Sequence, residues 1–463
     1  MDIDTITEKE ETQLPKEFGI PSVHLRQIND WLDAGEAEKV RGYVRDLHAA
    51  DIADLIEKLD SDGRERLLDT VRADLPAMVF SHLDEQVRAA VLARMSADEI
   101  GRIVAELRSD DALDLIEDLD KDKRSIALKY LSVLARAFVE EGLTFPEESA
   151  GRLMCRELIA IPEFWTVTKT LRYLRMAGES LPDNFLDIYI VDPMHQVKGV
   201  VPLSRLIRAS RNQKVGDIAQ TDVYPVAAET DQEDVGFLFR KYGLSSAPVI
   251  DSAERLIGII TADDVLEIVY SEAGEDILKL GGVSEDDIYA AAIKTSRSRF
   301  SWLGINLVTA IAASVVIGLF EATIDQVVAL AVLMPIVASM GGNAGTQTLT
   351  VAVRALATKE LGPANALRVV GKETLVGAIN GVLFALIASI VVMFWFRDPL
   401  LGVVIGLAMI VNLLVAGLAG ALIPLGLNRI RIDPAVASSV VLTTITDVVG
   451  FFVFLGLASI ILF

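Results

Sequence analysis

The chain has 463 residues, of which 52% are hydrophobic, and it carries a formal net charge of −22. Residues 301–463 contain seven basic and seven acidic side chains, so the whole acidic excess lies in residues 1–300. Nucleic acid is excluded as a partner for so acidic a front part, because phosphate binding needs clustered Lys and Arg. The composition predicts an acidic water-exposed module joined to a membrane domain.

The N-terminus and the single cysteine indicate where the front module resides. Cys155 has no second cysteine for a disulfide or a thiolate metal cluster, which fits a reducing compartment. The first residues, MDIDTITEKEETQLPKE, are polar and acidic and do not resemble a signal peptide. We expect residues 1–30 to form a flexible tail and the front module to stay in the cytoplasm.

Residues 31–147 are predicted to be an acidic domain of helical repeats. DIADLIEKLD (51–60) and DALDLIEDLD (111–120) match at seven of ten positions. Between them, Ser96 and Glu99 form a capping-box pattern ahead of apolar residues at helical spacing. We expect short amphipathic helices stacked as a small superhelix.

Residues 148–275 contain a second repeat, with an offset of 59 residues. Each copy has an apolar strand, an Asp, six residues, a Gly, a second strand and a helix, as in Asp192 to Gly199 and Asp251 to Gly258. This αβ pattern resembles a pair of CBS modules, a regulatory fold that often binds adenine nucleotides.

The resemblance to CBS modules implies one nucleotide site at most. Thr261 and Asp264 in the second copy look like the ribose-contacting pattern of the family, which makes ATP a candidate ligand. The first copy has Pro202 and Arg205 at the matching places.

The densest acidic run follows the second CBS-like copy. Six carboxylates lie within 14 residues: Asp263, Asp264, Glu267, Glu272, Glu275 and Asp276. Several fall three or four residues apart, where like charges on a helix face repel unless cations neutralise them. A solvated face is the alternative, but the cluster as a whole favours a sensor for partly hydrated Mg²⁺. We expect a connecting helix over 276–299.

The region 300–463 is predicted to cross the membrane five times, because a span needs about 20 apolar residues. The predicted spans are 301–320, 326–349, 373–396, 400–426 and 435–463. Basic residues gather before the first span and in the loops after the second and fourth, which places the front module inside and the C-terminus outside. An odd number of helices does not close a symmetric pore, so we expect a homodimer.

Asp447 lies near the middle of the last span, with no Lys or Arg in the same span. A carboxylate at that depth is costly and usually faces a water-filled path. Ser439, Thr443 and Thr444 place hydroxyl groups on the same helix face. An ion pathway is therefore favoured over a protonated Asp bonded to a neighbouring helix.

The motif GGNAGTQT (341–348) is the second polar feature of the membrane domain. Three glycines among five residues argue against a continuous helix. Free carbonyls, for example of Gly342, and the Asn343 amide are then candidates for coordinating a cation. Tight helix packing through small residues is an equally good interpretation.

Asp433-Pro434 opens the last span. Asp at the N-cap with Pro at the first helical position is sufficient to explain the pair. A second role for Asp433, as a cation ligand near the inner mouth, is compatible with this.

Together these parts resemble the MgtE family of magnesium transporters. The resemblance rests on the acidic helical repeat, ESAGRLM (148–154) before the CBS pair, five spans, GGNAGTQT and DPAVAS…TTITD (433–447). It covers nearly the whole chain beyond about residue 30. It implies a homodimeric Mg²⁺-selective channel in the cell membrane, and no enzyme.

The resemblance also implies roles for individual residues. Asp447, Asn343 and Gly342 fall in the pore motifs. The residues that match cytoplasmic positions implicated in Mg²⁺ sensing are Asp433, Asp264, Glu267, Glu272, Glu275 and Glu233. One acidic family position is Gly243 here. In the N-domain the alignment suggests only Asp110, Asp111 or Asp114.

Charge supplies a mechanism for gating. At low internal Mg²⁺ the acidic modules repel one another and pull the connecting helix from the pore, and at high Mg²⁺ bound ions bridge them. The sequence contains no Walker-type loop, so it gives no indication of ATP hydrolysis as an energy source.

Other functions remain as alternatives. One is a broader divalent cation transporter for Co²⁺, Ni²⁺ or Mn²⁺, and another is a non-transporting membrane sensor with CBS modules. An anion channel is disfavoured by the unpaired Asp447. An intramembrane metalloprotease fails because all four histidines lie outside 301–463.

Overall fold

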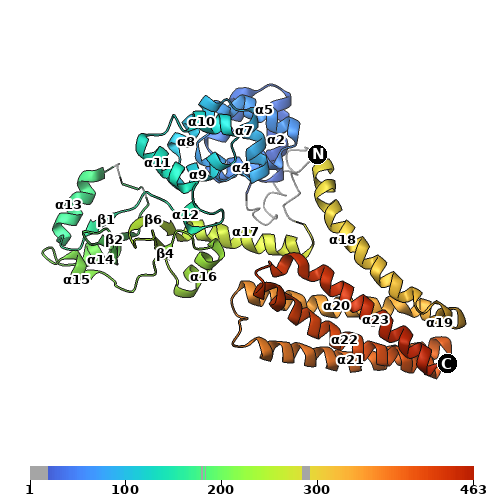
Figure 1. Ribbon diagram of the computed structural model, residues 1–463. Coiled ribbons are helices and arrows are strands. Elements are labelled where there is room, and N and C mark those ends of the chain that lie inside the picture. Colours follow the sequence, from blue (N-terminus) through green and yellow to red (C-terminus); the bar gives the residue numbers. More distant parts are fainter. Residues whose placement is uncertain (1–18, 179–180, 183, 284–291) are drawn as a thin grey trace, which may run out of the picture. The chain divides into compact units, whose positions relative to one another are not determined.

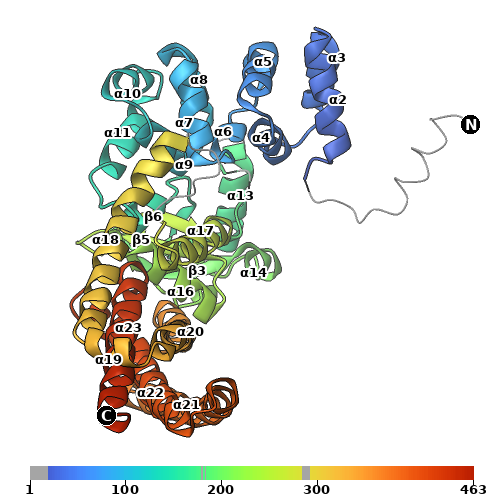
Figure 2. The ribbon, with the colours of Figure 1, turned by 90° about the vertical axis from the view of Figure 1, so that its right-hand side faces the viewer.

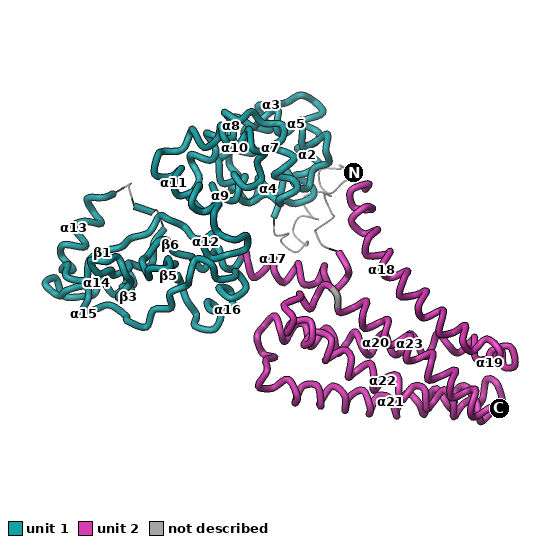
Figure 3. The backbone as a smooth tube through the Cα atoms, in the orientation of Figure 1, with its two compact units in different colours: residues 1–266 teal, residues 267–463 magenta. Residues whose placement is uncertain are grey.

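The computed structural model describes residues 19–178, 181–182, 184–283 and 292–463. The chain divides into two compact units, residues 1–266 and residues 267–463 (Figure 3). The first unit contains a helical domain and two small sheets, and the second contains the long apolar helices. The predicted fold class, an all-α repeat domain, an α/β CBS pair and an α-helical membrane domain, is confirmed.

The N-terminal domain is a row of short helices around one apolar core, as predicted. Figure 2 shows them side by side, with α2 and α3 at one end and α10 and α11 at the other. The elements are α2 (Ser22–Asp33), α3 (Ala37–Arg45), α4 (Ala49–Lys58), α5 (Ser61–Val71), η1 (Arg72–Asp74), α6 (Met78–Ser81), α7 (Glu85–Arg94), α8 (Ala97–Glu106), α9 (Ser109–Glu117), α10 (Lys121–Ala127) and α11 (Val133–Gly142).

The internal repeat of this domain appears in its helix ends. Arg64 donates from Nε to the Ile56 carbonyl at 2.8 Å, and Arg124 donates from Nη2 to the Glu117 carbonyl at 2.9 Å. Each guanidinium satisfies carbonyls at the end of the preceding helix, which lack a partner within that helix. The capping box predicted at Ser96 is also present.

The boundary predicted for the flexible tail is wrong. Residues 1–18 of that segment lie outside the described residues, but helix α2 begins at Ser22 and buries Ile28. Leu25 and Trp31 pack on the same core, because positions three apart share a helix face. The folded domain therefore begins before residue 31.

The CBS pair contains two three-stranded sheets with matching topology. In each sheet the first two strands are parallel and the last two are antiparallel. The elements are α12 (Ala150–Leu153), β1 (Ala160–Pro162), α13 (Val167–Ala177), β2 (Asp187–Val191), β3 (Val197–Pro202), α14 (Leu203–Arg208), α15 (Val215–Ile218), β4 (Val226–Ala227), α16 (Gln232–Tyr242), β5 (Ser246–Ile250) and β6 (Leu256–Thr261).

The aspartates that mark the 59-residue repeat build the same turn twice. Asp192 Oδ1 accepts from the backbone N–H groups of Met194 and Gln196, and Asp251 Oδ1 accepts from those of Ala253 and Arg255. An Asp side chain that bonds backbone two residues on defines the tight connection between antiparallel strands. The sequence repeat thus corresponds to the same Asp-stabilised turn in both copies.

The predicted connecting helix over 276–299 is not one helix. Helix α17 (Ala262–Leu280) runs directly from strand β6 and stops at Gly281 and Gly282, and Gly282 has φ +73°. That left-handed conformation favours glycine and ends a helix. Residues 284–291 lie outside the described residues, and α18 begins at Ala292. The predicted boundaries at 275 and 299 therefore fall inside helices.

Within the described residues, five helices are long and apolar enough to cross a membrane, as predicted. Helix α21 packs against α22, α22 packs against α20 and α23, and α18 contacts α23 (Figure 1). The membrane-unit elements after α17 are α18 (Ala292–Gly318), α19 (Glu321–Gln326), α20 (Ala329–Ala357), α21 (Ala366–Phe396), α22 (Pro399–Arg429) and α23 (Pro434–Ile461).

The expectation of a broken helix at GGNAGTQT is wrong. Helix α20 is continuous from Ala329 to Ala357, through both Pro335 and the glycines. The glycines are tolerated because neighbouring helices approach them: a methyl added to Gly345 would lie 2.9 Å from Leu442 Cδ1 on α23. Helix packing through small residues, the alternative interpretation of this motif, describes the structure.

Candidate functional site

Helix α20 carries a polar stripe on one exposed face. The stripe recurs at spacings of three and four residues, and its members are Asn343, Thr346, Gln347 and Thr350. The opposite face, with Gly341 and Leu349, is buried. In a bilayer, amides and hydroxyls are not left facing lipid, so this stripe requires water or protein beside it.

The predicted ligands in GGNAGTQT lie on or beside this stripe. Asn343 Nδ2 lies 3.4 Å from Ser339 Oγ, and the Gly342 carbonyl accepts from Thr346 Oγ1 at 2.9 Å. The backbone carbonyls in this stretch belong to a helix and are not free, contrary to the sequence-based expectation. Coordination by α20 would therefore come from side chains, chiefly the Asn343 amide.

Asp447 lies in α23 and is half-buried. Among the described residues, none makes a hydrogen bond or ion pair with its carboxylate. The hydroxyls on its helix face donate to their own backbone: Thr443 Oγ1 to the Ser439 carbonyl at 3.1 Å, and Thr444 Oγ1 to the Val440 carbonyl at 2.6 Å. The carboxylate is thus available to an ion or to water.

Asp433 forms the N-cap of α23, as predicted. Its Oδ1 accepts from the Ala435 N–H at 2.8 Å, with Pro434 at the first helical position. Its Oδ2 lies 2.9 Å from Lys279 Nζ, and Lys279 is also 2.7 Å from Glu275. Two of the predicted metal-binding carboxylates therefore meet, and a lysine ammonium supplies the positive charge between them.

The electrostatics at this helix end favour a positive charge. Burial and the nearby Asp433 raise the pKa of Asp276, which shows that a further negative charge is unfavourable there. Burial alone would lower the pKa of Lys279, but its bonds to Glu275 and Asp433 raise it overall, so the ammonium stays charged. Three carboxylates thus surround one cation.

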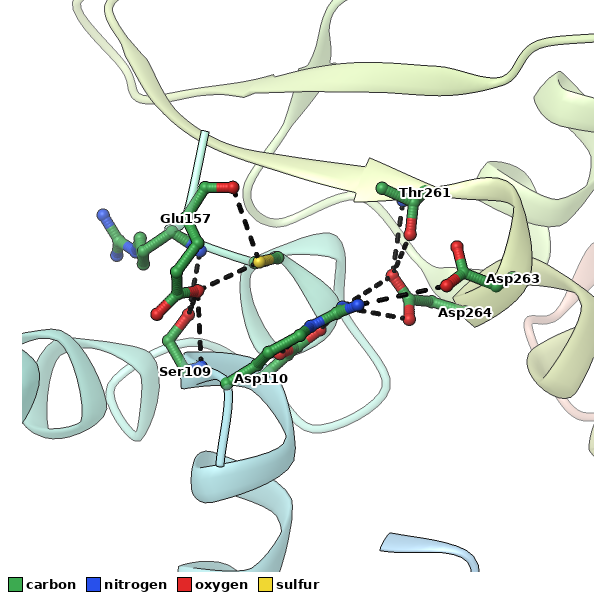
Figure 4. Close-up of polar contacts among 9 residues, drawn as sticks. Ser109, Asp110, Glu157, Thr261, Asp263 and Asp264 are labelled. Atoms are coloured by element: carbon green, nitrogen blue, oxygen red, sulfur yellow. Dashed lines mark hydrogen bonds and ion pairs between the residues drawn. The ribbon is translucent and has the colours of Figure 1, made fainter. Parts of the chain in front are cut away.

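A second charged cluster in the first unit contains Asp110, Asp263 and Asp264 (Figure 4), and Arg108 lies within ion-pair distance of all three. Its guanidinium pairs with Asp110 and lies 3.2 Å from Asp264 Oδ1. Asp264 Oδ2 also accepts from Thr261 Oγ1 at 2.6 Å. The structure therefore brings together two predicted metal ligands and the predicted nucleotide residues, and Arg108 provides their positive partner.

Cys155 and Glu157 lie beside this cluster. Ligand atoms of Asp110, Cys155 and Glu157 all lie within 4.8 Å of one another, with Cys155 Sγ 3.0 Å from Glu157 Oε2. Burial raises the pKa of the Cys155 thiol, so the thiol is protonated and donates to the carboxylate. This geometry is a hydrogen-bonded interface between the N-terminal domain and the CBS pair.

The other N-domain candidates, Asp111 and Asp114, have different surroundings. Asp114 and Asp118 both pair with Arg88, whose side chain is only 7% exposed. Burial, followed by the charge of Asp110, raises the pKa of Asp111 to about 6. Asp114 is 61% exposed and pairs with the buried Arg88, apart from the contacts of Arg108 with Asp110 and Asp264.

The remaining predicted sensor residues lie on helices. Glu233 is in the first turn of α16, and Glu267 and Glu272 lie along α17, with Glu267 exposed and Glu272 half-buried. Gly243, which the resemblance aligns with an acidic family position, ends α16 with φ +63°. A left-handed C-terminal position explains glycine there.

Three participating residues were not predicted from the sequence. Arg108 and Lys279 are isolated basic residues in acidic stretches. A single positive charge among acidic residues is the sequence signal by which they could have been found. Glu373, at the start of a predicted span, is buried and accepts from Thr348 Oγ1 at 3.3 Å. A carboxylate entering a span is itself a marker of function.

Comparisons with known proteins decide the family. The family model described as a divalent cation transporter, MgtE, matches residues 334–457, which include Asn343, Asp433 and Asp447. The models of the MgtE intracellular N domain and of the CBS domain match residues 47–148 and 215–271. The magnesium transporter MgtE of Thermus thermophilus is 33% identical over 443 residues, 94% of this chain and 98% of that protein. The chain belongs to the MgtE family.

Further MgtE proteins are similar over long stretches. The magnesium transporter MgtE of Bacillus subtilis is 27% identical over 92% of this chain and 94% of its own length. A crystal structure of the cytosolic domain of the Mg²⁺ channel MgtE in complex with ATP is 31% identical, with a TM-score of 0.48, and covers 53% of this chain and 99% of that one. The resemblance stated from the sequence motifs is confirmed.

Proposed function

We propose that this MgtE-family chain admits Mg²⁺ across the cell membrane, down its electrochemical gradient, under the control of intracellular Mg²⁺. Two observations together carry the proposal: an exposed polar stripe on α20, and Asp447 on the adjacent α23, whose carboxylate has no partner in the described part of the chain. Polar groups at membrane depth are retained where they line an aqueous path.

Mg²⁺ suits this sparse set of ligands. The ion gives up its water reluctantly and is usually held by one or two carboxylates through a partly intact hydration shell. Asp447 supplies the charge and the Asn343 amide supplies a polar contact for that shell. Entry needs no fuel, because a divalent cation gains about 4.6 kcal/mol per 100 mV of membrane potential.

Several observations support a homodimer with cytoplasmic front domains. Val269, Tyr270 and Ile277 are exposed apolar side chains on α17, outside the membrane-spanning helices, and the Asn343 side of α20 also lacks a cover in one chain. A second copy would cover both faces and close the path. The distribution of basic residues supports a C-terminus on the extracytoplasmic side.

Gating in this proposal uses the carboxylates at the start of α23 and along α17. Glu275 and Asp433 are bridged by Lys279, so the arrangement already tolerates one positive charge. Mg²⁺ bound by Asp433, Glu275, Glu272, Glu267, Asp264 or Glu233 would stabilise the shut state by mass action. Thr261 and Asp264 remain candidate contacts for ATP, which would compete with Arg108 for Asp264.

The direct test is flux in proteoliposomes that contain the full chain. We expect Mg²⁺ uptake that is driven by an inside-negative potential, exceeds Ca²⁺ uptake and falls as lumenal Mg²⁺ is raised. Uptake of Co²⁺, Ni²⁺ or Mn²⁺ as fast as Mg²⁺ would indicate a broader divalent transporter. Absence of any cation flux from a correctly oriented, assembled protein would favour a sensor instead.

Lys279→Met removes the ammonium that bridges Glu275 and Asp433, and we expect this to weaken closure of the channel. Without the ammonium, Glu275 and Asp433 repel unless a divalent ion binds, so flux at low internal Mg²⁺ should rise about two- to fivefold, the range of one partly exposed ion pair. Lys279→Arg, which keeps the charge, is the control. Equal flux in Lys279→Met and wild type at low Mg²⁺ would contradict the bridging role.

A further inference from the structure

Asn412 stands at the junction of three membrane helices. It lies on α22, is fully buried, and donates from Nδ2 to the Val337 carbonyl of α20 at 2.8 Å. It is the only residue with a polar side chain between positions 400 and 427. An isolated amide in so apolar a helix calls for an explanation other than burial.

The amide is costly where it lies. Its Oδ1 is buried and has no hydrogen-bond donor within the described part of the chain. Its one hydrogen bond goes to a carbonyl of a continuous helix. An apolar side chain of the same shape would avoid the unsatisfied oxygen at little loss. Stability alone therefore does not account for Asn412.

Two glycines make room for this side chain. A methyl added to Gly341 on α20 would overlap Asn412 Nδ2, and one added to Gly450 on α23 would lie 2.8 Å from the same atom. The amide therefore fills the space between the two helices, with a glycine of each against it. A larger side chain at position 412 does not fit this space without moving α20 or α23.

Those two glycines are next to the proposed pore residues. Gly341 is two residues before Asn343 on α20, and Gly450 is three residues after Asp447 on α23. Any change in the packing of α20 or α23 against Asn412 therefore occurs within one helical turn of the proposed pore side chains, Asn343 and Asp447.

We propose that Asn412 is a positioning residue that sets the separation of α20 and α23 and thereby the fit of the passage to hydrated Mg²⁺. The inference rests on the proposed function of Asp447 and Asn343. Mg²⁺ demands near-ideal octahedral geometry, whereas Ca²⁺ accepts six to eight ligands at longer distances. A passage with fixed spacing favours Mg²⁺, and a loosened one loses that preference.

The first test replaces the amide by an apolar side chain that branches at the same carbon but is bulkier. Asn412→Leu in the full chain should still assemble, because it removes the unsatisfied Oδ1, but its larger side chain presses on Gly341 and Gly450 and so changes the spacing of α20 and α23. In proteoliposomes its ratio of Mg²⁺ to Ca²⁺ flux should fall about tenfold, since an error of about 1 Å in positioning costs up to about 100-fold in enzymes. An assembled Asn412→Leu protein with the wild-type ratio would overturn the proposal.

The second test uses the glycine contact. Gly341→Ala should lower Mg²⁺ flux about tenfold by forcing α20 away from Asn412, whereas Gly371→Ala, which has open space beside it on α21, should not. Adding Asn412→Ala to Gly341→Ala should restore much of the flux by making room for the methyl. Absence of any rescue in the assembled double variant would count against the positioning role.

A parallel variant separates this inference from the proposed function. If Asp447→Asn still conducts Mg²⁺, the pore assignment fails, but the rescue of Gly341→Ala by Asn412→Ala still decides whether Asn412 sets helix spacing. If Asp447→Asn is inactive and Asn412→Leu keeps full selectivity, only the positioning role is wrong.

Discussion

Asp447→Asn should abolish Mg²⁺ flux in proteoliposomes while the protein still assembles. The substitution keeps the size of the side chain and removes its charge. Because the carboxylate has no hydrogen-bond or ion-pair partner among the described residues, no structural contact is lost with it. An amide cannot attract a hydrated divalent ion from water as a carboxylate does, so we expect at least a 100-fold loss, about 2.8 kcal/mol by the tenfold-per-1.4 relation.

Size-exclusion chromatography and thermal unfolding provide the control for this variant. Both should match the wild type, because burying an uncharged amide costs less than burying a carboxylate. Asp325→Asn, which neutralises a carboxylate of the short helix α19, should conduct normally. Flux through Asp447→Asn at the wild-type rate would refute the assignment of α23 to the pore.

Neutralising Glu267, Glu272 and Glu275 together to Gln should leave the channel open at millimolar internal Mg²⁺. These side chains lie along α17, and Glu275 also holds Lys279 at 2.7 Å. Without the three carboxylates, bound Mg²⁺ has fewer ligands and the shut state loses its stabilisation by mass action. The measurement is Mg²⁺ flux as a function of lumenal Mg²⁺.

The control must change the net charge equally without altering α17. Asp62→Asn, Asp69→Asn and Glu106→Gln neutralise three exposed acids of the N-terminal domain. That triple variant should be inhibited by Mg²⁺ as the wild type is. If the α17 variant is inhibited at the same concentration, Mg²⁺ sensing does not depend on these residues.

Local sequence signals predicted much of the fold because they encode local chemistry. Asp192 and Asp251 were found by their spacing, and each makes the same turn. The capping pattern of Ser96 and the N-cap at Asp433 depend on contacts within three residues, which the sequence shows directly. Such features need no knowledge of the tertiary structure.

The errors arose where tertiary packing decides the outcome. Gly341 and Gly345 were expected to break a helix, since glycine is a poor helix former in isolation. In the structure they allow Asn412 and Leu442 to approach α20 closely, and the helix continues. Arg108 and Lys279 were missed because their partners are distant in sequence: Asp264 lies 156 residues from Arg108.

The polar stripe of α20 also bears on how the protein is made. A helix with Asn343 and Gln347 on its surface partitions into lipid less readily than α21 or α22. Its packing partners α22 and α23 are synthesised later, so α20 enters the bilayer before the helices that bury its other face exist. The segment proposed to line the pore is therefore the one whose membrane insertion depends most on the completion of the chain.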